Sequence, residues 1–194
     1  MQSALPQEQE RYTYADYKKW PEQPRYELID GVAYMMSPSP TFGHQSIVLK
    51  LGRLLGDYLD GKPCVPAIAP LDVLFPEEGD DDDDVDTILQ PDVVVVCDRS
   101  KYDMDGKVVG APDLVIEVLS PRTTIRDFDI KKRKYERHGV REYWIVSTKA
   151  RMISQYKLID GKYEGVDVIE GRIESSVIEG FGFELGELFA VLDI

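Results

Sequence analysis

Two long segments carry apolar residues at the three-and-four spacing of an amphipathic helix. In the segment 42–60 this spacing predicts one buried helix face, and Gly61 marks its end. The apolar positions of that face are Ile47, Val48, Leu51, Leu54, Leu55, Tyr58 and Leu59. Thr124 and Asp127 form a capping-box pattern that opens a second helix, which ends at His138-Gly139. A shorter helix is expected after Thr13 and Asp16 and stops before Trp20-Pro21.

Short apolar runs between turn residues predict the strands. The runs 26–29 and 32–35 flank Asp30-Gly31, which is a strong hairpin signal. The runs 93–96 and 114–119 are almost entirely apolar, as is typical of strands covered on both faces. Further strands are expected at 71–75 and 140–146, and Asp160-Gly161 and Glu170-Gly171 predict hairpins in a β-rich tail.

This order of elements predicts an α/β (α+β) fold with a mixed sheet flanked by helices and extra β-hairpins at both ends. The chain has 194 residues, enough for one well-buried core and too few for two ordinary domains. We expect a flexible tail over 1–11 and a single domain over 12–194.

Composition limits the class of protein. The chain is 43% hydrophobic and 30% charged, and it has no apolar run of roughly 18 to 20 residues that could cross a bilayer. The N-terminal residues lack the layout of a signal peptide, so we expect a cytoplasmic protein with no membrane partner. Cys64 and Cys97 belong to no CxxC pattern, and neither a disulfide framework nor a structural zinc site is expected.

The charge balance is acidic, with 36 Asp and Glu against 23 Lys and Arg and a net charge of −13. Proteins that bind nucleic acid usually have a basic surface, so the total argues against such a function. Much of the excess lies in the segment 77–86, which includes five consecutive aspartates, Asp80 to Asp84. That run lacks the spaced ligands of an EF-hand, and like-charge blocks are usually disordered, so we expect a loop without a specific metal.

Asp92 and Glu117 are the strongest candidates for chemistry. Asp92 precedes one apolar strand, and Glu117 lies inside the next, where burying an ionised carboxylate requires a compensating cation or metal. Strands that are neighbours in sequence often pair in space, so the two carboxylates can converge. Mg²⁺ suits such hard oxygen ligands and takes only one or two carboxylates. Asp113, four residues before Glu117, fits a strand-start cap better than a metal ligand.

Four motifs in this order carry a family resemblance: Tyr26-Glu27-Leu28-Ile29-Asp30-Gly31, Gln90-Pro91-Asp92-Val93-Val94-Val95-Val96, Pro112-Asp113-Leu114-Val115-Ile116-Glu117-Val118-Leu119-Ser120-Pro121 and Gly139-Val140-Arg141-Glu142-Tyr143-Trp144-Ile145-Val146. Together they closely resemble the Uma family of "putative restriction endonucleases" within the PD-(D/E)XK superfamily. The resemblance spans about residues 12–191. It implies a restriction-endonuclease-like core and a Mg²⁺-dependent phosphodiesterase site in which Mn²⁺ can substitute.

The resemblance also implies individual roles. Asp92 and Glu117 match the superfamily's metal-binding carboxylates, but Leu119 stands where its signature has Lys. The basic residue then comes from the following helix, where the family pattern is matched by Asp127, Lys131, Tyr135 and Gly139-Val140. Glu27 and His44 match two further positions near the site, and Ser147 departs from the Asp usual in the family. The expected catalytic set is therefore Asp92, Glu117 and Lys131.

Three functions stay open on these residues. The first is an endonuclease acting on DNA, with a homodimer expected by analogy with restriction enzymes. The second is a catalytically degenerate module that keeps the fold to bind nucleic acid or a protein, which the acidic charge and Leu119 favour. The third is a hydrolase of a smaller phosphate ester. The basic run around Lys131 has a plainer explanation as a solvated helix face, and Lys131 is singled out by the family spacing alone.

Overall fold

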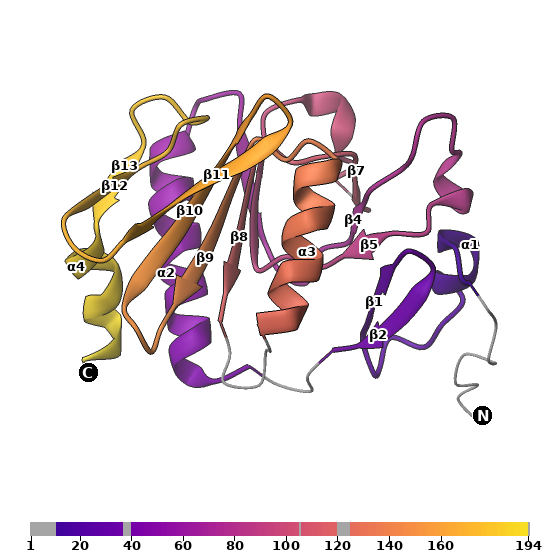
Figure 1. Ribbon diagram of the computed structural model, residues 1–194, viewed down its shortest axis with the longest axis horizontal. Helices are drawn as coiled ribbons and strands as arrows, with labels where there is room; N and C mark the ends of the chain where they lie inside the picture. Colours follow the sequence, from indigo (N-terminus) through magenta and orange to yellow (C-terminus); the bar gives the residue numbers. More distant parts are fainter. Residues whose placement is uncertain (1–10, 37–39, 105, 120–124, 194) are drawn as a thin grey trace.

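A six-stranded mixed sheet forms the centre of the fold in the computed structural model, which describes residues 11–36, 40–104, 106–119 and 125–193 (Figure 1). The strand order is β11-β10-β9-β8-β6-β3. Strands β8 and β9 are parallel, and all other neighbours in this sheet are antiparallel. The bounds are β3 (Val65–Ile68), β6 (Val93–Val96), β8 (Leu114–Val118), β9 (Glu142–Ser147), β10 (Met152–Ile159) and β11 (Lys162–Val168).

Two long helices cover opposite faces of this sheet. Helix α2 (Phe42–Leu59) packs on the face that includes Val93 and Val95, whereas α3 (Ile125–Arg137) covers the face of Val94 and Val96. All four valines are buried, because successive side chains of a strand point to opposite faces. The prediction of strands covered on both sides is confirmed, as are the two long helices.

A second sheet of five strands lies beside the first (Figure 1). Its order is β2-β1-β5-β4-β7, with β1 (Tyr26–Ile29), β2 (Val32–Met35), β4 (Val73–Leu74), β5 (Ile88–Leu89) and β7 (Val108–Val109). Asp30 and Gly31 have φ values of 50° and 76°, which is the left-handed geometry that the predicted two-residue hairpin requires. The chain passes from this sheet to the six-stranded one through Gln90, Pro91 and Asp92, so the two sheets meet at the candidate carboxylate.

Elsewhere the strand predictions need correction. The strand expected at 71–75 is only two residues long, and β9 begins at Glu142. Asp160-Gly161 joins β10 to β11 as predicted, but the hairpin expected at Glu170-Gly171 is wrong. There β12 (Arg172–Glu174) pairs with β13 (Gly182–Glu184), because Ile173 and Phe183 are buried beneath α2. A turn residue determines where a strand ends, whereas side-chain packing determines which strand it pairs with.

The remaining helical segments are short. Helix α1 (Tyr14–Tyr17) begins with the predicted capping box of Thr13 and Asp16, and α4 (Leu185–Phe189) leads into the 3-10 turn η3 (Ala190–Leu192). Two more 3-10 turns are η1 (Asp82–Asp84) and η2 (Arg99–Lys101). The capping box predicted at Thr124 lies outside the described residues. No described helix is both long and apolar enough to span a membrane.

The acidic segment 77–86 is not the disordered loop expected from its charge. Asp82 pairs with Lys107 at 2.9 Å, Asp83 pairs with Lys18, and the neighbouring Val85 is fully buried. Cations from distant parts of the chain thus surround the run, and the valine anchors it. Local charge density predicts disorder only when no tertiary partner compensates it.

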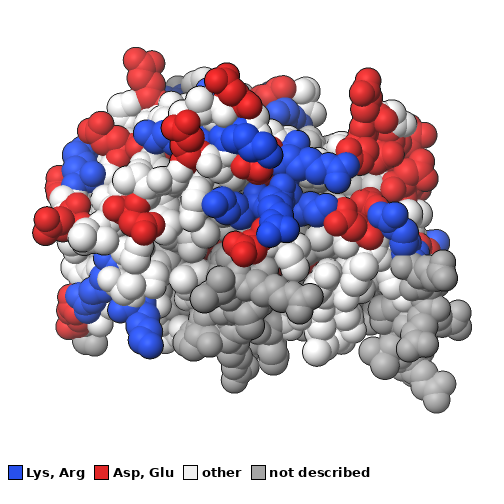
Figure 2. Space-filling view, viewed as in Figure 1, with Lys and Arg blue, Asp and Glu red and all other residues white. Residues whose placement is uncertain are grey.

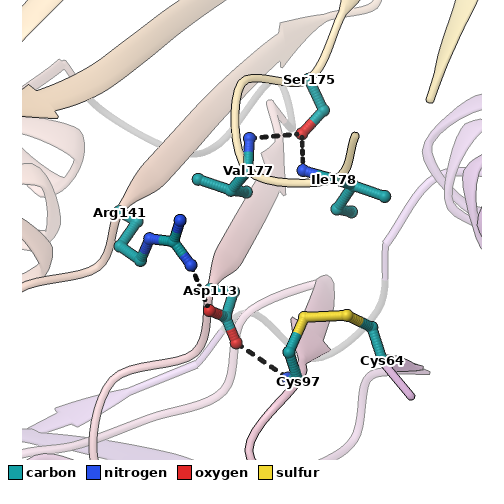
Figure 3. Close-up of a disulfide and its surroundings, with 7 residues drawn as sticks. All are labelled: Cys64, Cys97, Asp113, Arg141, Ser175, Val177 and Ile178. Atoms are coloured by element: carbon teal, nitrogen blue, oxygen red, sulfur yellow. Dashed lines mark hydrogen bonds and ion pairs between the residues drawn. A yellow bond between two sulfur atoms is a disulfide. The ribbon is translucent and has the colours of Figure 1, made fainter. Parts of the chain in front are cut away.

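A disulfide joins Cys64 and Cys97, contrary to expectation (Figure 3). The two residues lie at the ends of β3 and β6, where the register pairs Val65 with Val96. They are 33 residues apart in sequence, so only strand pairing makes them neighbours. In the same view Asp113 accepts a hydrogen bond from the Cys97 backbone N–H at 2.8 Å and pairs with Arg141 at 2.9 Å. Asp113 thus caps the start of its strand, as predicted.

Candidate metal and catalytic site

Pairing between β6 and β8 brings the two candidate carboxylates together. Val93 pairs with Ile116, and continuing this antiparallel register by one residue sets Asp92 opposite Glu117. The backbone N–H of Val118 donates to Asp92 Oδ2 at 2.8 Å, which fixes the side chain against β8. The predicted convergence of these two strands is therefore observed.

Helix α3 supplies the partners of Glu117. Its Oε1 accepts hydrogen bonds from Lys131 Nζ at 2.9 Å and from the Tyr135 hydroxyl at 2.8 Å. Lys131 and Tyr135 are four residues apart and so lie on the same side of the helix. Tyr135 is fully buried against Phe75 and Tyr143, which holds its hydroxyl in place.

A second carboxylate, from the other sheet, also binds Lys131. Glu27 Oε1 lies 2.7 Å from Lys131 Nζ and accepts a hydrogen bond from the Gln90 backbone N–H at 2.8 Å. The hairpin strand β1 therefore contributes to the same site as β6 and β8. The side chains of Lys131, Glu27 and Glu117 are only 14%, 9% and 8% exposed, so this is a buried ionic cluster.

His44 completes the group from the first turn of α2. Thr41 caps this helix and accepts from the His44 backbone N–H at 3.2 Å. The ring is buried, and its Nε2 lies 3.2 Å from Asp92 Oδ2. Asp92 is thus held between His44 and the Val118 backbone.

Burial and charge shift the pKa values of these groups. Burial raises the pKa of Glu117 to about 7, opposed by the charge of Lys131 and reinforced by the carboxylates of Asp92 and Glu27. For Lys131, burial favours the neutral amine, but Glu117 and Glu27 outweigh it and raise the pKa above its ordinary value. Burial likewise lowers the pKa of His44, yet the hydrogen bond and charge of Asp92 leave it raised.

The oxygen atoms of the two carboxylates suit a hard divalent cation. Both Asp92 contacts fall on Oδ2 and both Glu117 contacts fall on Oε1. No described residue donates a hydrogen bond to Asp92 Oδ1 or Glu117 Oε2, and these are the two oxygens that could hold a ligand. Within the described parts of the chain, no group of three or more His, Cys, Asp or Glu side chains is arranged around a metal position. Mg²⁺ needs only one or two carboxylates, with water completing its shell, and the donor set fits it.

The structure also gives the positions of most other residues that the sequence analysis named. Leu119 donates its backbone N–H to Val146 at 2.8 Å and brings no charge to the site. Lys134, whose spacing from Lys131 predicts the same side of the helix, is buried and paired with Asp30, so the alternative of a solvated face does not hold for it. The side chain of Asp127 lies outside the described residues. Ser147 ends β9 and accepts from the Ala150 backbone N–H.

Two contributors were not identified as site residues from the sequence. Gln90 holds Glu27 through its backbone, and its side chain amide donates to Asp72 at 2.8 Å. Its place two residues before Asp92 was the available signal. The hydroxyl of Tyr135 contacts Glu117, and its spacing of four from Lys131 could have indicated this contact.

Comparison with known proteins shows which family has this sequence and fold. A family profile described as "Uma2: Putative restriction endonuclease" matches residues 14–190. The chain belongs to the Uma2 family. This Uma2 chain is 30% identical over 144 residues to an uncharacterised protein of Synechocystis sp., slr1290, covering 73% of this chain and 71% of that protein.

The fold also matches a solved structure, described as a putative nuclease belonging to DUF820 from Anabaena variabilis. The TM-score is 0.74 at 20% identity, over 93% of this chain and 98% of that one. The predicted fold class, a mixed α/β nuclease fold, is confirmed for this Uma2 chain. The roles of its individual residues stay predictions.

Proposed function

We propose that this Uma2 chain is a Mg²⁺-dependent endonuclease that hydrolyses phosphodiester bonds in DNA. The observation that carries the proposal is the contact of Lys131 Nζ with Glu117, across the strand pair that also brings Asp92 to the site. This geometry supplies two carboxylates and one cation from the expected elements. The family description and the nuclease fold support the same reaction class.

Asp92 and Glu117 would hold the metal through the oxygens that accept no hydrogen bond from described residues. A bound Mg²⁺ activates water and stabilises charge on a phosphate. His44 and the Val118 backbone orient Asp92, and Tyr135 orients Glu117. These contacts fix the carboxylates before substrate arrives, which reduces the reorganisation needed in the reaction.

Lys131 would take the place of the lysine that the superfamily signature has at position 119. Its raised pKa keeps the amine protonated, so it provides a fixed positive charge near the scissile phosphate. Glu27 also binds the ammonium, so two carboxylates, Glu27 and Glu117, hold Lys131 in place. Glu27 is thus a positioning residue for Lys131.

The test is Mg²⁺- or Mn²⁺-dependent nicking of supercoiled plasmid by the purified chain. We expect Asp92→Asn, Glu117→Gln and Lys131→Met each to lower the rate by at least about 10²-fold, as loss of preorganised charge stabilisation typically does. Lys62→Met is the matched control, since Lys62 is exposed and follows the end of α2 opposite to His44. Circular dichroism checks that each variant folds.

Titration calorimetry separates metal binding from cleavage. Asp92→Ala combined with Glu117→Ala should abolish Mn²⁺ binding, whereas Lys131→Met should retain it. Metal binding without cleavage in the wild type would favour the degenerate binding module, which the net charge of −13 also favours. Equal Mn²⁺ binding by the double variant would place the metal elsewhere.

A further inference from the structure

The cations of α3 point in two directions. Lys131 and Lys134 face inward and bind Glu27, Glu117 and Asp30. Lys132, Arg133 and Arg137 face away from these carboxylates, and we call these three residues the α3 basic face. They gather on the surface over α3, where Figure 2 shows a compact group of Lys and Arg atoms. The helix thus carries a concentrated positive surface on a chain whose net charge is −13.

The fold makes little use of these three side chains. Arg133 is exposed, and Arg137 is paired with Glu77 at 2.7 Å in a contact where both side chains are about half exposed. Such surface pairs contribute little to stability and exchange readily for another anion. Lys132 is partly exposed, with Nζ 3.9 Å from the centre of the Tyr156 ring, and among the described residues it forms no ion pair.

We infer that the α3 basic face binds the phosphate backbone of double-stranded DNA beside the catalytic site. This inference rests on the proposed function. Arg133 and Arg137 are one helical turn, roughly 6 Å, apart, and Lys132 adjoins Arg133. The helix that inserts Lys131 into the site therefore presents three cations on its outer side, within the width of a duplex whose major groove alone spans about 12 Å.

The chemistry of the surface favours a duplex over a single strand. Proteins that bind single strands stack the bases on exposed aromatic side chains. The exposed large aromatic residues of the described chain are Tyr34 and Phe42, and neither lies on α3. Tyr156, the aromatic ring at this face, is only partly exposed and is covered by Lys132. The face therefore offers charge rather than an open stacking surface, as expected for contacts to a duplex backbone.

Acidic residues mark one end of this surface. Glu77, which binds Arg137, begins the acidic segment 77–86. Figure 2 shows Asp and Glu atoms gathered beside the α3 cluster. Because this segment repels phosphates, the duplex should lie on the side of Arg137 that faces away from Glu77.

The experiment measures binding of a fluorescent 30-base-pair duplex by anisotropy, in EDTA and again with Ca²⁺, from 50 to 200 mM KCl. The test variant combines Lys132→Gln, Arg133→Gln and Arg137→Gln. Its matched control combines Arg53→Gln, Lys62→Gln and Lys149→Gln, which removes the same charge away from α3. Each phosphate contact contributes about 0.9 to the slope of log affinity against log salt, so the test variant should lower the slope by about 2 to 3.

An equal slope for the test variant and its control would overturn the inference. If, in addition, the triple variant still nicks plasmid in the presence of Mg²⁺ and adding Glu117→Gln abolishes this nicking, the proposed function stands without the basic face. If the wild type binds no duplex in either buffer, both fail together. Equally tight, salt-sensitive binding of a single-stranded 30-mer would overturn the duplex assignment.

Discussion

Two buried glutamates on the β8–β9 strand pair make an instructive contrast. Glu142 starts β9, where it pairs with Leu114, whereas Glu117 lies near the end of β8, where it pairs with Ile145. The exposed fraction of the whole residue is 0% for Glu142 and 6% for Glu117. Both would be expensive to bury alone, yet the protein compensates them in different ways.

Neutral donors satisfy Glu142 on both oxygens. Trp144 and Gln155 donate to Oε1 at 2.7 and 2.5 Å, and Ser175 and the Ser176 backbone donate to Oε2 at 2.7 and 2.9 Å. The contacts tie β9 to β10 and to the loop before β13. Such a carboxylate has a structural role, since its lone pairs are already used.

Glu117 is compensated by a cation, and its Oε2 accepts no hydrogen bond from the described residues. Its described partners, Lys131 and Tyr135, both bind Oε1. The like charges of Asp92 and Glu27 nearby raise its pKa further. Burial alone therefore does not distinguish the two carboxylates. An incomplete hydrogen-bond shell among the described residues, together with like-charge neighbours, is what makes Glu117 the candidate for a functional role.

The largest stability effect should come from Glu142→Gln. The new amide group would face donors instead of accepting from them, so at least two buried N–H or O–H groups lose their acceptor. At about 1–3 kcal/mol for each unsatisfied buried group, we expect a loss of roughly 3 kcal/mol in the free energy of unfolding. Urea denaturation measures it. A loss below about 1 kcal/mol would remove the structural role assigned to Glu142.

Glu117→Gln should behave in the opposite way, and its effect depends on pH. A carboxyl whose pKa is raised from 4.5 to about 7 in the folded state stabilises the protein fully below pH 4.5 and loses that contribution as pH rises through 7. Glutamine does not titrate. The variant should therefore gain stability relative to wild type between pH 4.5 and 7.5, by at most about 3 kcal/mol at 1.36 kcal/mol per pKa unit.

Parallel urea titrations of wild type and Glu117→Gln across that pH range, without divalent metal, provide the measurement. The control is Ser46→Ala, which removes no titratable group, so its difference from wild type should stay nearly constant. A difference for Glu117→Gln that is also flat with pH would show that the carboxyl is not held in the environment described.

Tyr135→Phe should have a smaller effect. It removes one hydrogen bond to Glu117 while keeping the buried ring, so the free energy of unfolding should fall by about 1–2 kcal/mol. The pKa of Glu117 should rise further, because the lost bond favoured the ionised form. An upward shift in the midpoint of the pH-dependent stability difference would show it, and an unchanged midpoint would contradict the contact.

Neutralising the exposed aspartates should change stability least. Asp82→Asn and Asp83→Asn each break an ion pair in which the aspartate is more than half exposed, with Lys107 and Lys18 respectively. Their melting curves should overlay that of the wild type. From its charge alone, deleting the whole of 79–84 would be expected to leave the fold intact. In the structure, however, the deletion also removes both ion pairs beside the buried Val85. A clear loss of stability in either single variant would mean that the segment is part of the core.

The sequence by itself determined the elements whose causes are local. Asp30-Gly31 specifies its hairpin through backbone geometry, the apolar spacing of 42–60 specifies α2, and the unbroken valines of β6 specify a doubly covered strand. Asp92, Glu117 and Lys131 could be selected because a carboxylate in an apolar strand needs compensation, and because the family spacing supplied the cation. That selection is a prediction about chemistry, which the contacts support and experiment must test.

Tertiary structure decided everything that depends on distant partners. The edge strand β3 contains Pro66 and was not predicted, and the disulfide between Cys64 and Cys97 exists only because β3 pairs with β6. Glu142 lies in a motif that was visible in the sequence, yet its donors come from residues up to 35 positions away. The spacing of apolar residues and the chemistry of turns act over a few residues, whereas packing across the whole chain sets the pairing of strands. That pairing in turn determines which oxygen atoms of a buried carboxylate accept hydrogen bonds.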